Sequence, residues 1–522
     1  MIHESVYVPG EGGTRIAVDA WASSGERRPA VLVQHRYWRG ADLRWPFGRG
    51  GPQPGAAAAR MLAAGYAVVD IDVRGAGASF GARPDEWPPE EAGDAAAVLD
   101  WIVSRPWSDG RVAAVGISYG GTAALLLAAR GHPALRAVAA RFCFWDLADD
   151  LVLPGGVRNT WLAERWAERV AVLDRGRLPI GGVRARLAVR GPRAVAGGRR
   201  ELRAALAEHG SEGSAERGRT VTAGQLRGRA PSSLAAAIRA SGVAVHSLGG
   251  WYDGASTRAA VEIHRALGGE LVLGPWDHGG YHDVSPHNAS GEMRFDIAGE
   301  VLGFLGRVFE MPGAEPAPPV RYQVVGEERW RTSAGWPPPG TTALPLHLDA
   351  DGGLSPAPPA AGVDNHELDL AASSGERTRW RGQLQPAPPT SYAGRAAPAC
   401  AYTSAPFPDG LEIAGEPVCL LTLEAGAERA NLFCYLDEIA PDGSATYITE
   451  GCAAATGPWP SVARVELQPI AYRIDAGSAL RLSFAAVDGD VFEPPPAGGS
   501  RIRVHRAGPQ PSRLELPVTA RA

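Results

Sequence analysis

Between Val31 and Phe142 the chain alternates β-branched runs with Ala- and Leu-rich runs, and this alternation is the strongest constraint on its fold. The runs AVLVQH, AVVDIDV, RVAAVGIS and LRAVAARF have the length and apolar character of buried strands. Between them, GAAAARMLAAG, PEEAGDAAAVLDWIV and YGGTAALLLAAR have helical spacing. Strands separated by helices form parallel sheets, and strands that are apolar throughout must be covered on both faces. The pattern therefore predicts a doubly covered, mostly parallel sheet.

The strand signal stops near residue 145 and returns near residue 241. The segment between, 145–240, contains runs such as NTWLAERWAERVAVL and RRELRAALAEHG, whose spacing is helical. Strands resume in VAVHSLGG and ELVLGPW, and the helix-like run FDIAGEVLGFLGRVF follows them. We therefore predict one core made of residues 1–144 and 241–311, interrupted by a helical cap insertion over 145–240.

A proline-rich stretch, PGAEPAPPV, begins after Met311 and marks a change in the character of the chain. The rest of the chain consists of short strand-like runs with Gly and Pro turns between them, from VRYQVVG through PVCLLTLEAG and ALRLSFAAV to RLELPV. Many evenly spaced strands without helical periods are typical of a β-sandwich. Residues 312–522 are predicted to form a C-terminal all-β domain of jelly-roll type.

Composition narrows the possible partners and the compartment. The formal net charge is −5, so the chain lacks the general basic field that holds nucleic acid or an anionic membrane. The five cysteines are widely spaced and form no CxxC pair, which favours reduced thiols over disulfides or a zinc ribbon. The start MIHESVYVPGEGG lacks the features of a signal peptide, and no stretch has the length of an apolar membrane span. We expect a cytoplasmic protein that binds neither nucleic acid nor membrane.

The string Gly-Ile-Ser118-Tyr-Gly-Gly lies where a predicted strand meets a predicted helix. A Gly-x-Ser-x-Gly string alone is weak evidence, but a strand-to-helix turn requires small residues around a strained position that lifts the serine hydroxyl above the sheet. The alternative is a glycine-rich turn with an incidental serine. We interpret Ser118 as a nucleophile.

A serine nucleophile needs an imidazole to take its proton and a carboxylate to orient that imidazole. Asp253 follows the strand VAVHSLGG, and His278 follows ELVLGPW, so both lie at strand ends where such sheets place their sites. Asp277 is an alternative acid, but it adjoins His278 in the chain and is poorly placed to reach its ring. His282 and His287 are alternative bases.

Stabilising the oxyanion requires two donors, and one is usually the backbone N–H after the nucleophile, here that of Tyr119. The loop after the strand AVLVQH reads Arg36-Tyr37-Trp38, without an HGGG run to supply backbone amides. The Tyr37 hydroxyl is therefore the candidate for the second donor, and the alternative is a tyrosine that only packs beneath the insertion.

Taken together and in order, these motifs resemble those of the CocE/NonD hydrolases, the family of cocaine esterase and X-prolyl dipeptidyl peptidase. The resemblance extends from the early tyrosine loop through DVRGAGAS, GISYGG, GWYDG and GPWDHGG to VRYQVVGEERWRTSAGWPPPG. It implies an α/β-hydrolase core, a helical cap and a jelly roll. It also implies that Ser118, Asp253 and His278 are the triad and that Tyr37 and Tyr119 form the oxyanion hole.

The sequence departs from one feature of this family. Members that cleave α-amino acid esters carry acidic residues just after the catalytic aspartate, whereas Asp253 is followed by Gly-Ala-Ser-Thr. Carboxylates in the insertion are alternative anchors for a substrate ammonium: Asp146, Asp149, Asp150, Glu164 and Glu168. We expect an uncharged acyl group and an aromatic pocket. The tryptophans predicted to line that pocket, for which core packing is the alternative, are Trp161, Trp166, Trp251 and Trp276.

We therefore predict a serine hydrolase, most simply an esterase, that cleaves a small ester or amide through an acyl-enzyme. The alternatives are an X-Pro dipeptidyl peptidase, an acyltransferase with the same triad, and a saccharide-binding protein with a vestigial core. No cofactor or metal is expected, because the HExxH-like string at His366 has Leu370 in its fifth position. A homodimer formed through the sandwich is possible.

Overall fold

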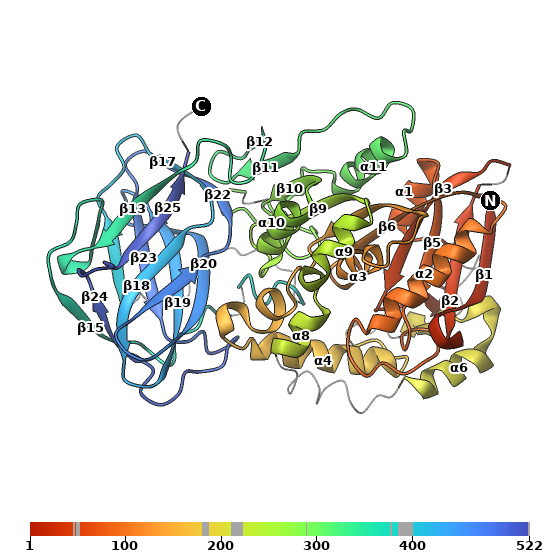
Figure 1. The fold of residues 1–522 in the computed structure, drawn as a ribbon, viewed down its shortest axis with the longest axis horizontal. Helices are drawn as coiled ribbons and strands as arrows, with labels where there is room; N and C mark the ends of the chain where they lie inside the picture. Colours follow the sequence, from red (N-terminus) through yellow and green to blue (C-terminus); the bar gives the residue numbers. More distant parts are fainter. Residues whose placement is uncertain are drawn as a thin grey trace.

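The computed structural model describes residues 1–23, 25–44, 47, 53–179, 187–209, 223–288, 290–375, 378–384 and 400–519. It has two large units side by side, an α/β core and a β-rich unit, with helices α4 and α6 along one side of the core (Figure 1). The core has an α/β-hydrolase fold.

The core is built on a ten-stranded sheet with the order β1-β2-β5-β3-β6-β7-β9-β10-β11-β12. The seven strands from β5 to β11 in this order pair in parallel, and the pairs at the two edges, β1 with β2, β2 with β5 and β11 with β12, are antiparallel. The strands in chain order are β1 (Ile2–Pro9), β2 (Arg15–Ala22), β3 (Arg28–His35), β5 (Ala67–Asp72), β6 (Ser108–Ile117), β7 (Leu135–Arg141), β9 (Ala244–Gly250), β10 (Glu270–Gly274), β11 (Val320–Val324) and β12 (Arg329–Ser333).

Helices cover both faces of this sheet, which explains why its central strands are apolar throughout. One face packs against α1 and α11 through side chains such as Met61 and Phe304. The other face packs against α2, α3, α9 and α10 through side chains such as Leu99, Leu125 and Ile263. These helices are α1 (Ala56–Ala63), α2 (Pro89–Val103), α3 (Tyr119–Ala128), α9 (Ala235–Ala240), α10 (Ser256–Leu267) and α11 (Ile297–Val308).

The end of the core differs from the boundary predicted at residue 312. The run VRYQVVG was assigned to the sandwich, but in the structure β11 pairs in parallel with β10, with Leu271 opposite Val320. Its partner β12 adds a further antiparallel strand to the same sheet. The physical reason is that α11 and the proline-rich stretch form a crossover that returns the chain to the sheet. The first strand of the β-rich unit is β13, which begins at Thr342.

The segment between β7 and β9 is mainly helical in its described parts. Its longer helices are α4 (Thr160–Asp174), α6 (Arg199–Glu208) and α8 (Ala223–Arg229). The side chain of Asn159 caps α4 by accepting a hydrogen bond from the Leu162 N–H at 2.9 Å. A short strand that the sequence did not predict, β8 (Val189–Pro192), pairs with β4 (Ala41–Leu43) and ties this cap to the core.

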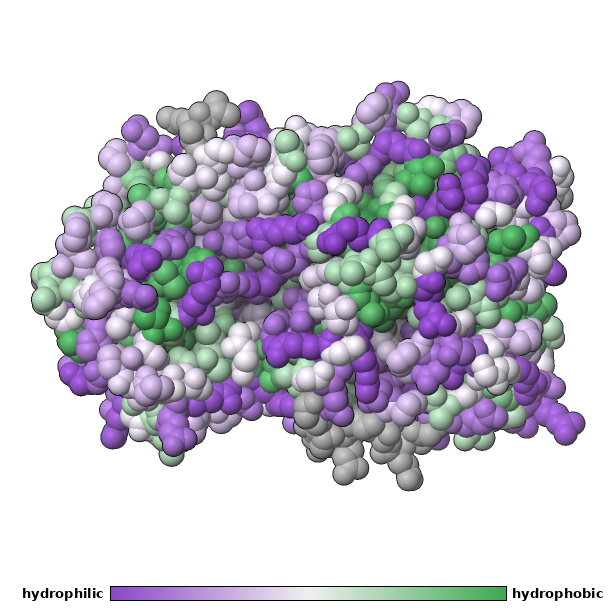
Figure 2. All heavy atoms as spheres, viewed as in Figure 1, coloured by the Kyte–Doolittle hydropathy of each residue, from purple (hydrophilic) through white to green (hydrophobic). Residues whose placement is uncertain are grey.

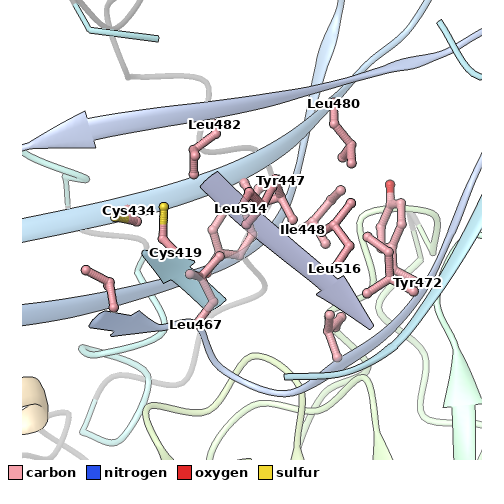
Figure 3. Packing of buried hydrophobic residues seen from close by; sticks show 14 of the residues in the cluster. Cys419, Cys434, Tyr447, Ile448, Leu467, Tyr472, Leu480, Leu482, Leu514 and Leu516 are labelled. Atoms are coloured by element: carbon pink, nitrogen blue, oxygen red, sulfur yellow. The ribbon is translucent and has the colours of Figure 1, made fainter. Parts of the chain in front are cut away.

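The C-terminal unit is a β-sandwich of thirteen strands linked in one hydrogen-bonded network. Its interior is a cluster of aliphatic, tyrosine and cysteine side chains, including Cys419, Cys434, Leu482 and Leu514 (Figure 3). The strands are β13 (Thr342–Leu348), β14 (Gly353–Ser355), β15 (Val363–Glu367), β16 (Ala401–Ser404), β17 (Leu411–Gly415), β18 (Val418–Ala425), β19 (Arg429–Ile439), β20 (Ala445–Thr456), β21 (Ser461–Glu466), β22 (Ile470–Ile474), β23 (Ala479–Ala485), β24 (Arg501–His505) and β25 (Arg513–Val518).

On the face shown in Figure 2, hydrophilic and hydrophobic residues are interspersed over both units. Among the helices that the structure describes, none combines the length and the hydrophobicity needed to cross a membrane.

Candidate active site

Ser118 occupies a sharp turn between β6, which ends at Ile117, and α3, which begins at Tyr119. Its backbone has φ 55° and ψ −119°, a conformation that costs a non-glycine residue free energy and is kept only by its surroundings. A Cβ atom on Gly116 would overlap the carbonyl group of Gly120, and one on Gly121 would lie 2.8 Å from Cys143 Cβ. The turn therefore requires its glycines, as the sequence predicted, and Ser118 lines a cavity above the sheet.

Asp253 and His278 come together at the neighbouring ends of β9 and β10. His278 Nδ1 lies 3.0 Å from Asp253 Oδ1 and 2.9 Å from Oδ2. The Asp253 side chain is fully buried, whereas the His278 ring is 11% exposed and lines the same cavity as Ser118. A buried carboxylate in this position fixes the imidazole tautomer with its proton on Nδ1, which leaves Nε2 free to act as a base.

The alternative acid and bases have partners of their own. Asp277 accepts hydrogen bonds from the backbone N–H groups of Tyr281 and His282, and its Oδ2 lies 2.6 Å from His282 Nδ1. His287 lies 3.1 Å from the Tyr472 hydroxyl through Nε2. These contacts commit Asp277, His282 and His287 to the loop that follows β10 and to its contact with the sandwich.

The Tyr37 hydroxyl lies at the cavity wall, where it already acts as a hydrogen-bond acceptor but not as a donor to any residue described. It accepts a hydrogen bond from Trp166 Nε1 at 3.0 Å, so its own proton is available for a substrate. A tyrosine hydroxyl is protonated at neutral pH, and desolvation raises the pKa of Tyr37 further above its ordinary value. The rings of Tyr37 and Tyr119 meet edge to face with centroids 6.4 Å apart.

The Tyr119 side chain anchors the start of α3 in a buried polar network. Its hydroxyl accepts a hydrogen bond from Arg83 Nη1 at 2.7 Å and donates one to Glu91 Oε2 at 2.8 Å. The Trp87 ring stacks on the Tyr119 ring at 4.3 Å, and its Nε1 donates to the Tyr119 carbonyl at 3.1 Å. These contacts fix the peptide next to Ser118. These contacts were not predicted from the sequence, in which the unusual run RPDEWPPEE is the signal that marks their residues.

The cavity has a volume of about 660 Å³ and lies between the sheet edge and the cap. Its cap side is mostly apolar, with lining side chains that include Leu147, Leu151, Val152, Leu162 and Leu226, and the cap also contributes Arg169 and Arg229. Leu384, from the described segment 378–384 that precedes β16, also lines it. The cavity is therefore open to an apolar group on its cap side.

Of the four tryptophans expected in this pocket, only Trp166 lines it among the described residues. Trp251 is fully buried in the core shared with the sandwich, where its Nε1 donates to the Gln323 carbonyl at 3.0 Å. Trp276 packs in a separate buried cluster, and Trp161 packs on the sandwich side. The prediction was wrong for these three, because Trp251 and Trp276, which follow strand ends, fill core space, and Trp161, at the start of α4, packs against the sandwich.

The charges of the cavity wall are paired in most places. Among its lining carboxylates, Asp70 lies 3.0 Å from His35, Asp85 lies 2.8 Å from Arg229, and Glu86 lies 2.9 Å from Arg36. None of the cap carboxylates considered as ammonium anchors lines the cavity in the part of the chain that the structure describes. Those residues are Asp146, Asp149, Asp150, Glu164 and Glu168.

One group of residues outside the cavity has the spacing of metal ligands. His246, Glu270 and Glu300 place one ligand atom each within 4.8 Å of one another. Arg307 binds both oxygens of Glu270, at 2.9 and 2.6 Å, and Arg321 pairs with Glu300. These guanidinium groups compete with a cation for the same oxygens, so we interpret the cluster as an ion-pair network.

Comparisons with known proteins point to one family. Residues 12–280 match the family model described as X-Pro dipeptidyl-peptidase (S15 family), and residues 312–515 match its C-terminal non-catalytic domain. A Mycobacterium bovis protein named "Putative serine esterase" is 34% identical over 99% of this chain and 95% of its own length. The cocaine esterase of a Rhodococcus species is 25% identical over 86% of this chain and 82% of its own.

Solved structures share the whole fold. An archaeal aminopeptidase from a marine sediment Thaumarchaeota archaeon has a TM-score of 0.74 at 20% identity, covering 99% of this chain and 96% of that one. An α-amino acid ester hydrolase has a TM-score of 0.70 at 19% identity with the same coverage. The chain therefore belongs to the X-Pro dipeptidyl-peptidase S15 family, within the CocE/NonD group of serine hydrolases that its motifs resemble.

Proposed function

We propose that Ser118, Asp253 and His278 form the catalytic triad of an esterase, with the Tyr37 hydroxyl and the Tyr119 N–H as its oxyanion hole. The main support is the contact of His278 Nδ1 with both oxygens of the buried Asp253 carboxylate, in the wall of the cavity that Ser118 also lines. The strained backbone of Ser118 adds to this support.

In the proposed mechanism, His278 Nε2 takes the proton of Ser118 Oγ as that oxygen bonds to the carbonyl carbon of the substrate. The negative charge moves to the carbonyl oxygen, which accepts hydrogen bonds from Tyr37 and from the Tyr119 N–H. His278 then gives its proton to the leaving oxygen or nitrogen as that bond breaks. Water repeats the sequence and releases the acid, which restores Ser118.

The proposed substrate is a small carboxylic ester with an uncharged acyl group, because most of the cap residues that line the cavity are apolar. A dipeptidyl peptidase must anchor a free ammonium group, but the lining carboxylates Asp85 and Glu86 are paired with arginines and Asp70 contacts the His35 ring. Because the chain belongs to a serine hydrolase family, we favour a hydrolase over the alternative of a saccharide-binding protein. Acyl transfer to an amine or alcohol uses the same triad, and adding such an acceptor to the assay distinguishes transfer from hydrolysis.

The test compares p-nitrophenyl butyrate with Ala-Pro-p-nitroanilide in the wild type and in two matched variants. Asp253→Asn should lower kcat by about ten-thousandfold, because the imidazole loses its oriented tautomer. Asp277→Asn removes an equally buried carboxylate from the adjacent loop and should have a far smaller effect. Equal losses in both variants would contradict the assignment of Asp253, and faster cleavage of the peptide substrate would favour the peptidase.

We also propose that the protein works in the cytoplasm. All five cysteines are buried and none forms a disulfide. Buried thiols that stay reduced are typical of a reducing compartment.

A further inference from the structure

Arg141 is a cation in the cavity wall for which the described part of the chain offers no anionic partner. It is the last residue of β7, and its carbonyl accepts a hydrogen bond from the Ser118 N–H at 2.9 Å. Among the described residues no carboxylate pairs with its guanidinium, and its buried Nε–H has no acceptor. Burial lowers the pKa of Arg141 to about 10, so the side chain remains charged at neutral pH.

An unpaired guanidinium in a partly enclosed cavity is unusual. Removing a charge from water is costly unless a counter-charge or hydrogen bonds replace the lost hydration. Of the lining carboxylates, Asp85 and Glu86 are paired with Arg229 and Arg36, and Asp70 contacts the His35 ring. The ionisable group whose charge acts on the pKa of Arg141 is the phenol of Tyr281. The protein therefore leaves the hydrogen-bonding capacity of Arg141 open to a bound molecule.

The order of strands assigns Arg141 to one side of the nucleophile. In the sheet, β3 lies on one side of β6, and β7, β9 and β10 follow on the other. Tyr37 comes after β3, whereas Arg141 ends β7 and His278 comes after β10. The ring of Phe142, the residue after Arg141, packs edge-on against the His278 ring at 6.4 Å.

This side is the one that receives the leaving group. His278 protonates the departing oxygen or nitrogen, so the departing fragment must lie within its reach. Gly279 and Tyr281, which follow His278, line the cavity together with Arg141. The apolar cap residues are then left for the acyl group. Arg169, a second cavity cation for which no ion pair is found among the described residues, lies on the other side, since its charge acts on Tyr37.

We infer that Arg141 binds a carboxylate on the leaving group, so that the preferred substrates are acyl esters of hydroxy acids or acyl amides of amino acids. The inference rests on the proposed function. The planar guanidinium can donate two parallel hydrogen bonds to a carboxylate, so an arginine suits this role better than the ammonium group of a lysine. After the acyl carbon bonds to Ser118 Oγ and the ester bond breaks, His278 protonates the departing oxygen, and the hydroxy acid leaves from Arg141.

The test uses two esters that differ only in charge: 2-butanoyloxyacetate and its neutral isostere 2-butanoyloxyacetamide. Arg141→Gln should lower the ratio of kcat/KM for the acid over that for the amide by about 10- to 100-fold, the range expected for losing a charge-assisted hydrogen bond. Arg141→Lys should retain part of the preference. Arg136→Gln removes the same charge from the exposed beginning of β7 and should leave the ratio unchanged.

Two further measurements separate the possible failures. Turnover of p-nitrophenyl butyrate by each variant shows that its triad is assembled, and inhibition of the wild type by glycolate but not by glycolamide is expected without any substitution. An unchanged ratio in Arg141→Gln, or equal inhibition by both compounds, would overturn the inference while the proposed function stands. No turnover of any ester by the wild type, with no adduct at Ser118, would overturn both.

Discussion

At the scale of single residues, the hydroxyl of Tyr37 is the group whose role depends most on one contact. Trp166 donates to its oxygen, which leaves the Tyr37 proton available for an acceptor in the cavity that both residues line. Removing one oxyanion donor typically costs about 2.7 to 4 kcal/mol of transition-state stabilisation. We therefore expect Tyr37→Phe to lower kcat for p-nitrophenyl butyrate about a hundredfold or more, with little change in KM. An unchanged kcat in a folded Tyr37→Phe protein would remove Tyr37 from the mechanism.

The buried carboxyl group of Asp150 should make the free energy of unfolding depend on pH. Its side chain is 4% exposed and accepts hydrogen bonds from the N–H groups of Trp145 and Asp146, both at 2.8 Å. Burial outweighs these bonds and raises the pKa of Asp150 to about 7. An acid with a raised pKa in the folded state stabilises the fold fully at low pH, and this contribution is lost as pH rises from about 4 to about 7.

Asp150→Asn cannot ionise, so its free energy of unfolding should not show this loss. We expect the difference in unfolding free energy between Asp150→Asn and the wild type to move in favour of the variant up to about pH 7 and then to level off. Urea denaturation at several pH values between 5 and 8 measures it. A difference that is the same at every pH would contradict the raised pKa.

Site residues could be predicted where a pattern in the neighbouring sequence marks them, and could not where tertiary packing places them. Ser118, Asp253 and His278 each follow a recognisable strand, and strand ends in a parallel sheet meet at one edge. The positions of the pocket tryptophans were not predictable, because the direction of such a ring depends on which neighbouring unit packs against it. The role of Arg141 was not predictable either, because an arginine at the end of a strand is usually solvated.

At the scale of elements, the turn from β6 to α3 is the feature that determines the position of Ser118. The carbonyl group of Gly120 occupies the space of a side chain at Gly116. We expect Gly116→Ala to displace the start of α3 and to lower kcat/KM by about a hundredfold, because small displacements of a nucleophile have effects of that size. Overpacking should also destabilise the fold by about 1 to 3 kcal/mol.

Gly224→Ala provides the matched control. A Cβ atom at Gly224, in α8, meets no atom within 4 Å, so activity should stay unchanged. Stability should rise by up to about 1 kcal/mol, because alanine favours a helix over glycine. Full activity in Gly116→Ala would show that the turn tolerates a side chain, and the account of the elbow would be wrong.

The alternation of strands and helices predicted most elements of the core, because a doubly covered sheet imposes its apolar pattern on the sequence itself. It failed at β11 and β12, which have the polar residues and turns of an edge hairpin and therefore resemble the strands of the sandwich. Which sheet such a hairpin joins is decided by the crossover through α11. That connection is a property of tertiary packing, and no local pattern records it.

At the scale of the whole molecule, the segment before β16 connects the C-terminal unit to the loop of Asp253, the proposed carboxylate of the triad. Arg379 is 1% exposed, and its guanidinium donates to the carbonyls of Gly254 at 2.8 Å and Trp251 at 2.9 Å. The Gly254 N–H donates back to the Arg379 carbonyl at 3.0 Å. These bonds hold the loop on both sides of Asp253, so Arg379 acts as a positioning residue.

We expect Arg379→Ala to lower kcat about tenfold or more while KM changes little, because buried carbonyls lose their donors and the loop relaxes. Arg379→Lys should recover part of kcat. Arg381→Ala is the control, since Arg381 donates to the Asp490 carbonyl and stacks on Trp161, away from Asp253. A kcat that falls equally in Arg381→Ala and Arg379→Ala would indicate a general loss of stability and not a positioning role.

The most direct test of the central claim is the intact mass of the protein after treatment with a fluorophosphonate. This reagent forms a stable adduct only with an activated serine, so it reports the assembled triad whatever the natural substrate is. We predict one adduct on the wild type and none on Ser118→Ala, together with loss of p-nitrophenyl butyrate hydrolysis in that variant. An unlabelled wild type, or an adduct that persists in Ser118→Ala, would contradict the account.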